Sequence, residues 1–172
     1  MDLGLQDRVC IVTGSTAGIG LETARLLSRE GARVVVNGRS EDGVAQARRD
    51  VDAALGAAID LARPDGPAEL VAATEAEVGP VDCLVNNVGV AYQRSFEELA
   101  EDDWEAVWQL NVMSYVRAIR AVLPGMRERS AGRIVNVSST AAKRPSTGMP
   151  DYSVTKAAVL SAASPSPRRL RP

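Results

Sequence analysis

The 172-residue sequence contains no histidine. This absence excludes a Ser-His-Asp triad, a Cys-His dyad and any histidine-ligated metal site. Aromatic residues make up only 3%, so the core must be built from Ala, Val, Leu and Ile. The two cysteines, Cys10 and Cys83, form neither a CxxC motif nor a disulfide framework. We therefore expect two free thiols in the core.

Long hydrophobic runs are also missing. No stretch approaches the 18 consecutive apolar residues of a membrane-spanning helix, and the start of the chain does not resemble a signal peptide. The net charge of −2 does not suggest nucleic-acid binding. Three arginines near the end form only a small basic cluster. The sequence therefore predicts a cytoplasmic globular domain with neither a membrane nor a nucleic acid as partner.

Apolar runs alternate regularly with helical patterns. The runs predict strands at 9–12, 33–37, 57–59, 81–85 and 133–137. Helices are predicted at 19–30, 41–54, 67–78 and 101–129, with a bend near Pro124, and a further helix opens near Tyr152. Continuous apolar strands are typical of a parallel sheet covered on both faces. The pattern thus predicts an α/β fold with a doubly wound parallel sheet, Rossmann-like, of about five strands.

A glycine-rich turn lies between the first predicted strand and the first helix. Its sequence, residues 13–20, is TGSTAGIG. Gly14 permits a tight exit from the strand, Gly18 lets a pyrophosphate come close to the backbone, and Gly20 lets the helix pack close to the sheet. The phosphates would lie at the helix N-terminus. The alternative is that these glycines merely end a strand.

The end of the second strand indicates which dinucleotide would bind. An acidic residue here would hold a ribose 2′-hydroxyl, whereas an arginine would accommodate a 2′-phosphate. The sequence has Gly38 and Arg39 and no acid before Glu41. This pattern favours NADP over NAD, unless Arg39 is simply a surface residue in a turn.

Further candidate catalytic side chains follow the fifth predicted strand. Tyr152 and Lys156 are four residues apart and so share one face of a helix. A nearby ammonium favours the phenolate form of a tyrosine, which suits proton exchange with a carbonyl oxygen. Ser139 follows the fifth strand and could hydrogen-bond the same oxygen, whereas Ser138 is better explained as a capping residue. A Tyr–Lys pair alone could also arise by chance.

Taken in order, these motifs resemble the short-chain dehydrogenase/reductase family in its NADP-preferring form. The motifs are TGxxxGIG, NNxG at 86–89, a helix-borne asparagine, and serine followed by YxxxK. The resemblance covers about Leu5 to Ser161, with Val88 where the family usually has alanine. It implies hydride transfer between NADP(H) and a small carbonyl or alcohol. The implied catalytic residues are Asn111, Ser139, Tyr152 and Lys156.

The resemblance also implies the cofactor contacts. Asp60 would contact the adenine, and Asn87 and Gly89 would lie beside its ribose. The full set of implied cofactor residues is Gly14, Ser15, Thr16, Gly18, Ile19, Gly20, Arg39, Asp60, Leu61, Asn87, Gly89, Tyr152 and Lys156. No metal is implied. Residues 90–95 and 141–151 would line the substrate pocket, but the sequence does not name the substrate.

The pattern changes after Ser161. Residues 162–172 contain three prolines and few apolar side chains, so we expect a truncated dinucleotide-binding domain at 1–161 and a disordered tail. Family members continue with more strands and helices, and the tail reads like translation in a shifted frame. The sheet would then be incomplete on its C-terminal side, and a catalytically impaired nucleotide-binding remnant is the alternative function. The resemblance also implies a homo-oligomer that pairs through the long helix and the last one, of which the truncated chain would retain only a part.

Overall fold

The computed structural model describes residues 3–162, in which five strands form one parallel sheet. The strand order is β3-β2-β1-β4-β5. The strands are β1 (Val9–Val12), β2 (Arg33–Gly38), β3 (Leu55–Ala58), β4 (Cys83–Asn86) and β5 (Arg133–Asn136). The parallel five-stranded α/β sheet predicted from the sequence is confirmed. The predicted disordered tail lies outside the described residues.

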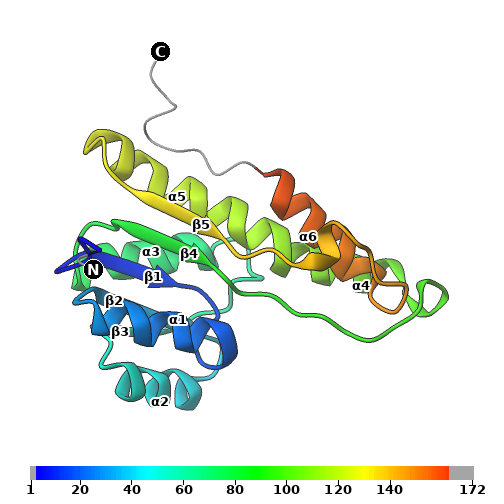
Figure 1. Ribbon diagram of the computed structural model, residues 1–172, viewed down its shortest axis with the longest axis horizontal. Coiled ribbons are helices and arrows are strands. Elements are labelled where there is room, and N and C mark those ends of the chain that lie inside the picture. Colours follow the sequence, from blue (N-terminus) through cyan, green and yellow to red (C-terminus); the bar gives the residue numbers. More distant parts are fainter. Residues whose placement is uncertain (1–2, 163–172) are drawn as a thin grey trace.

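Within residues 3–162 the chain also forms six α-helices, whose arrangement about the strands is shown in Figure 1. They are α1 (Gly18–Arg29), α2 (Glu41–Val51), α3 (Gly66–Glu77), α4 (Glu101–Trp108), α5 (Ser114–Glu128) and α6 (Pro150–Ser161). Short 3₁₀ turns occur at Phe96–Glu98 and Thr140–Ala142. None of the helices within residues 3–162 is long and apolar enough to cross a membrane.

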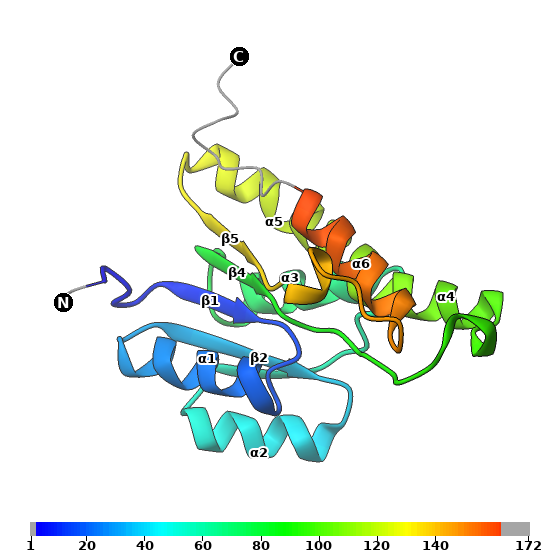
Figure 2. The ribbon, with the colours of Figure 1, turned by 45° about the vertical axis from the view of Figure 1, so that its right-hand side comes forward.

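The core has two halves, one on each face of the sheet. Along β1, Ile11 packs with residues of α3 and α5, while its neighbours Cys10 and Val12 pack with residues of α1 and α2. Figure 2 shows α1 and α2 on one side of the strands and α3 and α5 on the other. Successive side chains of a strand point to opposite faces, so a strand covered on both sides must be apolar throughout.

Both cysteines lie in this sheet as free thiols. Cys10 on β1 is fully buried and stands opposite Cys83 on β4, which is half-buried. The predicted free thiols are therefore confirmed, and their strands are neighbours.

The helical segment predicted at 101–129 differs most from the expectation. A π-helical segment, Gln109–Met113, separates α4 from α5, and α5 continues past Pro124 to Glu128. The third strand also begins two residues early, at Leu55, where it pairs with Val35. Its Leu-Gly-Ala-Ala sequence has little intrinsic strand preference, so pairing with β2 determines where it starts.

The strand order positions a crevice. β2 and β3 lie on one side of β1, and β4 and β5 lie on the other. The order therefore reverses between β1 and β4, and ligands of open parallel sheets bind beside the carboxyl ends of strands at such a point. The segments that leave β1 and β4 at this edge are residues 13–17 and 87–95, and they carry five of the predicted site residues, Gly14, Ser15, Thr16, Asn87 and Gly89.

Candidate active site

The turn after β1 depends on two glycines. Gly14 has a φ of +61°, and a Cβ there would lie 2.8 Å from the Cα of Val88. A Cβ on Gly20 would lie 2.4 Å from the carbonyl oxygen of Gly14 and 2.5 Å from Nδ2 of Asn87. Gly20 therefore lets α1 pack against the turn itself, rather than against the sheet as its motif position predicts.

The N-terminus of α1 has no side-chain cap and no acidic residue in its first turn. Gly18, its first residue, has a φ of +56°, and no described atom beyond its chain neighbours and the backbone of its own helix lies within 4 Å of where its Cβ would be. The preceding residue, Ala17, offers no side-chain acceptor, and the first turn carries no acidic residue. Amides at a helix start, together with the helix dipole, favour a phosphate. Ile19, which follows, is 70% exposed beside this opening.

Hydrogen bonds of Asn87 and Thr13 connect the ends of β1 and β4. Nδ2 of Asn87 donates to the carbonyl oxygens of Thr13 and Gly14, each at 3.0 Å. The Thr13 hydroxyl accepts from the backbone amides of Asn87, at 2.9 Å, and Val88, at 3.1 Å. The Asn87 amide thus holds the glycine turn in shape, and its contact with a ribose stays a prediction.

Ser15 lies beneath the turn, not on its open side. Its hydroxyl donates to the carbonyl oxygen of Val12 at 2.6 Å, and its amide donates to that of Asn37 at 2.8 Å. The side chain of Asn37 in turn donates to the carbonyl oxygens of Ala57 and Ile59. Both donors of Ser15 are used inside the protein, which leaves neither of them for the cofactor contact predicted for this residue.

Arg39 is exposed just after β2, close to the glycine turn. A Cβ on Gly38 would lie 2.5 Å from Cγ2 of Thr16, so Thr16 packs directly on this strand end. Ser40 caps α2 by accepting a hydrogen bond from the amide of Gly43 at 3.3 Å. Thr16, Arg39 and the start of α2 are therefore neighbours at the end of β2, and the 2′-phosphate contact of Arg39 stays a prediction.

Asp60 and Leu61 follow β3 but have different surroundings. Oδ1 of Asp60 accepts from the amide of Ala62 at 2.9 Å, which shapes the turn. The Leu61 side chain is only 2% exposed and belongs to the core cluster of α3 and α5. A side-chain contact between Leu61 and a cofactor does not fit this burial, which leaves only its backbone for that role.

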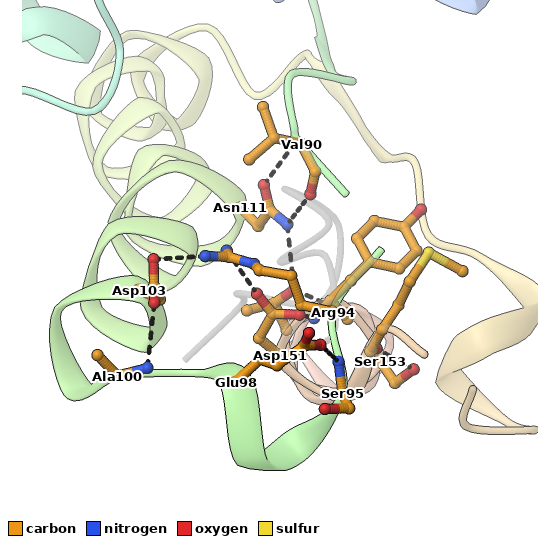
Figure 3. Close-up of polar contacts among 12 residues, drawn as sticks. Val90, Arg94, Ser95, Glu98, Ala100, Asp103, Asn111, Asp151 and Ser153 are labelled. Atoms are coloured by element: carbon orange, nitrogen blue, oxygen red, sulfur yellow. Dashed lines mark hydrogen bonds and ion pairs between the residues drawn. The ribbon is translucent and has the colours of Figure 1, made fainter. Parts of the chain in front are cut away.

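The π-helical segment places Asn111 in the interior, where it joins two segments. Oδ1 accepts from the amide of Val90, and Nδ2 donates to the carbonyl oxygen of the same residue, both at 2.9 Å (Figure 3). Nδ2 also donates to Oγ1 of Thr155 at 3.2 Å. Asn111 thereby fixes the segment after β4 to α6. Local π geometry is frequent at functional sites.

Lys156 reaches the same interior point from α6. A Cβ on Gly89 would lie 3.1 Å from Oδ1 of Asn111 and 3.6 Å from Nζ of Lys156. The amine is 5.8 Å from the centre of the Tyr152 ring and donates to the carbonyl oxygen of Val137 at 2.9 Å. Burial lowers the pKa of Lys156 to about 8. The structure thus brings Gly89, Asn111, Tyr152 and Lys156 together.

Ser139 lies three residues beyond β5, and its contact with the substrate stays a prediction. It caps the turn Thr140–Ala142, accepting from the amide of Ala141 at 3.2 Å, and this turn packs against α6. The Ser139 side chain is half-buried. The hydroxyl of Ser138 donates to the carbonyl oxygen of Lys156 at 2.9 Å. Ser138 therefore attaches α6 to the end of β5, a role that differs from the capping role predicted for it.

Arg94 is a residue to which the sequence analysis gave no individual role. Its guanidinium forms ion pairs with Asp103 at the start of α4 and with Asp151 at the start of α6 (Figure 3). Asp151 is 1% exposed and directly precedes Tyr152. The Arg94 amide also donates to the carbonyl oxygen of Gly148 at 2.9 Å. Arg94 therefore fixes the loop that leads into α6.

The family follows from a comparison of the chain with known proteins. A sequence model of the short chain dehydrogenase family matches residues 8–166. This chain belongs to the short-chain dehydrogenase family. It is 38% identical, over 164 residues, to the uncharacterized oxidoreductase YvrD of Bacillus subtilis. This match covers 94% of this chain and 62% of that protein. It is 34% identical to the 3-oxoacyl-[acyl-carrier-protein] reductase FabG of Vibrio cholerae, over 92% of this chain and 65% of that one.

Solved structures agree with this assignment. L-Sorbose reductase from Gluconobacter frateurii, complexed with NADPH and L-sorbose, superimposes with a TM-score of 0.88 at 36% identity. The match covers 94% of this chain and 63% of that structure. The chain thus spans about 60% of the length of these relatives.

Proposed function

We propose that this chain binds NADP(H) and provides the catalytic residues for interconverting a carbonyl and an alcohol in a small molecule. The observation that carries the proposal is the meeting of Asn111, Tyr152 and Lys156 at the sheet edge that also holds the glycine turn. NADP(H) bound there would supply or accept a hydride at the substrate carbon. Several structural relatives are complexes with NADPH or NADP, which supports the choice of cofactor.

The binding half of the proposal rests on shape and charge. The N-terminal amides of α1 would hold the pyrophosphate beside Gly18, and Ile19 would cover it. Arg39 and Thr16 would hold the 2′-phosphate that distinguishes NADP from NAD. The turn at Asp60, the backbone of Leu61 and the segment Asn87–Gly89 would border the adenosine. These groups follow β1, β2, β3 and β4, so all of them lie on the carboxyl side of the parallel sheet, and the strand order reverses between β1 and β4.

The catalytic half assigns one task to each polar side chain. The Tyr152 hydroxyl would donate a proton to the carbonyl oxygen during reduction and take it back during oxidation. The charged amine of Lys156 would stabilise the resulting phenolate. Ser139 would hydrogen-bond the substrate oxygen, and Asn111 would support the path by which the proton is replaced. The substrate is a small molecule with one oxidisable or reducible oxygen-bearing carbon.

The test separates binding from chemistry. Tyr152→Phe should abolish NADPH oxidation with a panel of ketones and keto esters while leaving NADPH affinity nearly unchanged by calorimetry. Arg39→Gln should weaken NADPH binding roughly tenfold or more, because a charge-assisted contact is lost, and leave NADH binding unchanged. Equal loss of both nucleotides in Arg39→Gln, or loss of NADPH binding in Tyr152→Phe, would contradict these assignments.

A further inference from the structure

Tyr115 is a second phenol at the candidate active site, and neither the sequence motifs nor the proposed mechanism uses it. It lies in the first turn of α5, two residues beyond the π-helical segment, and is only 2% exposed. Its hydroxyl accepts a hydrogen bond from Nζ of Lys156 at 3.3 Å and donates to the carbonyl oxygen of Val137 at 3.4 Å. Lys156 donates to the same carbonyl at 2.9 Å. The hydroxyl, the amine and the carbonyl therefore form a closed triangle.

We propose that Tyr115 is a positioning residue that holds the ammonium of Lys156 beside Tyr152. The proposal rests on the function assigned above to Lys156. A lysine side chain is a flexible four-carbon stem, so an amine that must act at one place needs fixed partners. Tyr115 supplies two such partners, an oxygen acceptor and a ring whose centre lies 5.4 Å from Nζ.

A phenol suits this task because it carries no charge. Burial, followed by the proximity of Tyr152, raises the pKa of Tyr115 above its usual value, so its hydroxyl stays protonated at any working pH. A carboxylate at the same place would also accept a hydrogen bond, but it would cancel the positive charge of Lys156. The neutral hydroxyl of Tyr115 orients the ammonium and leaves its charge available to Tyr152.

Among the described residues, the groups that surround the Lys156 amine carry no charge. Its own helix, α6, contributes Tyr152, and α5 contributes Tyr115. The strand end of β5 contributes the Val137 carbonyl, and the segment after β4 contributes Gly89. Burial is what lowers the pKa of Lys156 to about 8. Because Tyr115 accepts a hydrogen bond from the charged form, removing that acceptor must disfavour the charged form further.

The test uses the fact that the chain has two lysines, Lys143 and Lys156. Lysine labelled with ¹³C at the ε-carbon gives two NMR signals, which Lys143→Arg assigns. We expect the Lys156 signal to titrate near pH 8 in the parent chain and about one unit lower in Tyr115→Phe, which keeps the ring but removes the acceptor. Tyr92→Phe is the matched control, because Tyr92 is half exposed and lies against Arg94 instead.

An unchanged Lys156 midpoint in a folded Tyr115→Phe variant would overturn the proposal. If that variant does not fold, the parent chain decides the question. With tyrosine labelled at the ζ-carbon, the Tyr115 signal should move with the Lys156 midpoint near pH 8, and the Tyr92 signal should not. A Tyr115 signal that is flat through this range would overturn the proposal. Neither measurement needs NADP(H), so the proposed function and this inference fail separately.

Discussion

The Lys156→Met variant should be more stable than the parent chain at neutral pH, and this advantage should shrink as the pH rises. Lys156 is 3% exposed, and burial lowers the pKa of its amine from 10.5 to about 8. The folded state therefore binds the lysine proton more weakly than the unfolded state does. The penalty is fully present below pH 8, and it disappears as the pH rises past 10.5. Methionine has a similar length and carries no charge, so the variant avoids the penalty.

The size of the effect follows from the pKa difference. Each unit corresponds to about 1.4 kcal/mol, so the full penalty is about 3 kcal/mol. The stability advantage of Lys156→Met should shrink by about 2.5 kcal/mol between pH 7 and pH 10. The Val137 carbonyl keeps the Tyr115 hydroxyl as a donor, so the variant leaves this acceptor partnered.

Urea unfolding followed by circular dichroism at pH 7, 8, 9 and 10 measures this difference. Lys143→Met is the matched control, because Lys143 is exposed, and its advantage should not change with pH. If the Lys156→Met and Lys143→Met curves run parallel across this range, Lys156 is not held in an environment that disfavours its charge. The lowered pKa assigned to Lys156 from its burial would then be wrong.

Three further predictions concern the scaffold around the site. Gly20→Ala should lower the free energy of unfolding by about 1–3 kcal/mol, because its Cβ meets the Gly14 carbonyl. Arg94→Leu should destabilise the fold by roughly 3–5 kcal/mol in urea titrations, because it leaves the buried carboxylate of Asp151 unpaired, and adding Asp151→Asn should restore part of the loss. Cys10, whose thiol pKa is raised by its contact with Cys83 and by burial, should react with a thiol reagent only after unfolding.

Each of these predictions has a contrary outcome. A Gly20→Ala variant as stable as the parent would mean that α1 can shift away from the glycine turn. An Arg94→Leu variant that the Asp151→Asn change does not improve would mean that Arg94 acts by packing alone. Labelling of Cys10 in the native chain, detected by mass spectrometry of peptides, would mean that β1 opens readily.

The sequence predicted the sheet well because buried parallel strands leave a local signal. Runs such as Val34–Val36 are apolar on both faces, and glycine turns mark where the chain reverses. The third strand was placed two residues too late because Gly56 and its alanine neighbours carry little strand preference. Its start is determined by pairing with β2, which no short window of sequence contains.

In the candidate site, too, some residues could be predicted from local sequence and others depend on contacts between distant segments. Tyr152 and Lys156 could be predicted because a helix fixes residues four apart on one face. Tyr115 and Arg94 could not, because each reaches the site across contacts between distant segments. Ser15 and Leu61 were assigned to the cofactor from their place in a motif, and the structure places their side chains in the interior. Asn37, a polar residue at the end of an apolar strand, could have been used to predict the buried hydrogen bonds beneath the glycine turn.

In the proposed complex, NADP(H) would lie over the glycine turn with its reactive end beside Lys156. Addition of NADP⁺ to the chain labelled with ¹³C at the lysine ε-carbons tests this placement. We expect the Lys156 signal to shift in a saturable manner while the Lys143 signal stays where it is. Equal shifts of both signals, or no shift of Lys156 at saturating NADP⁺, would contradict the account.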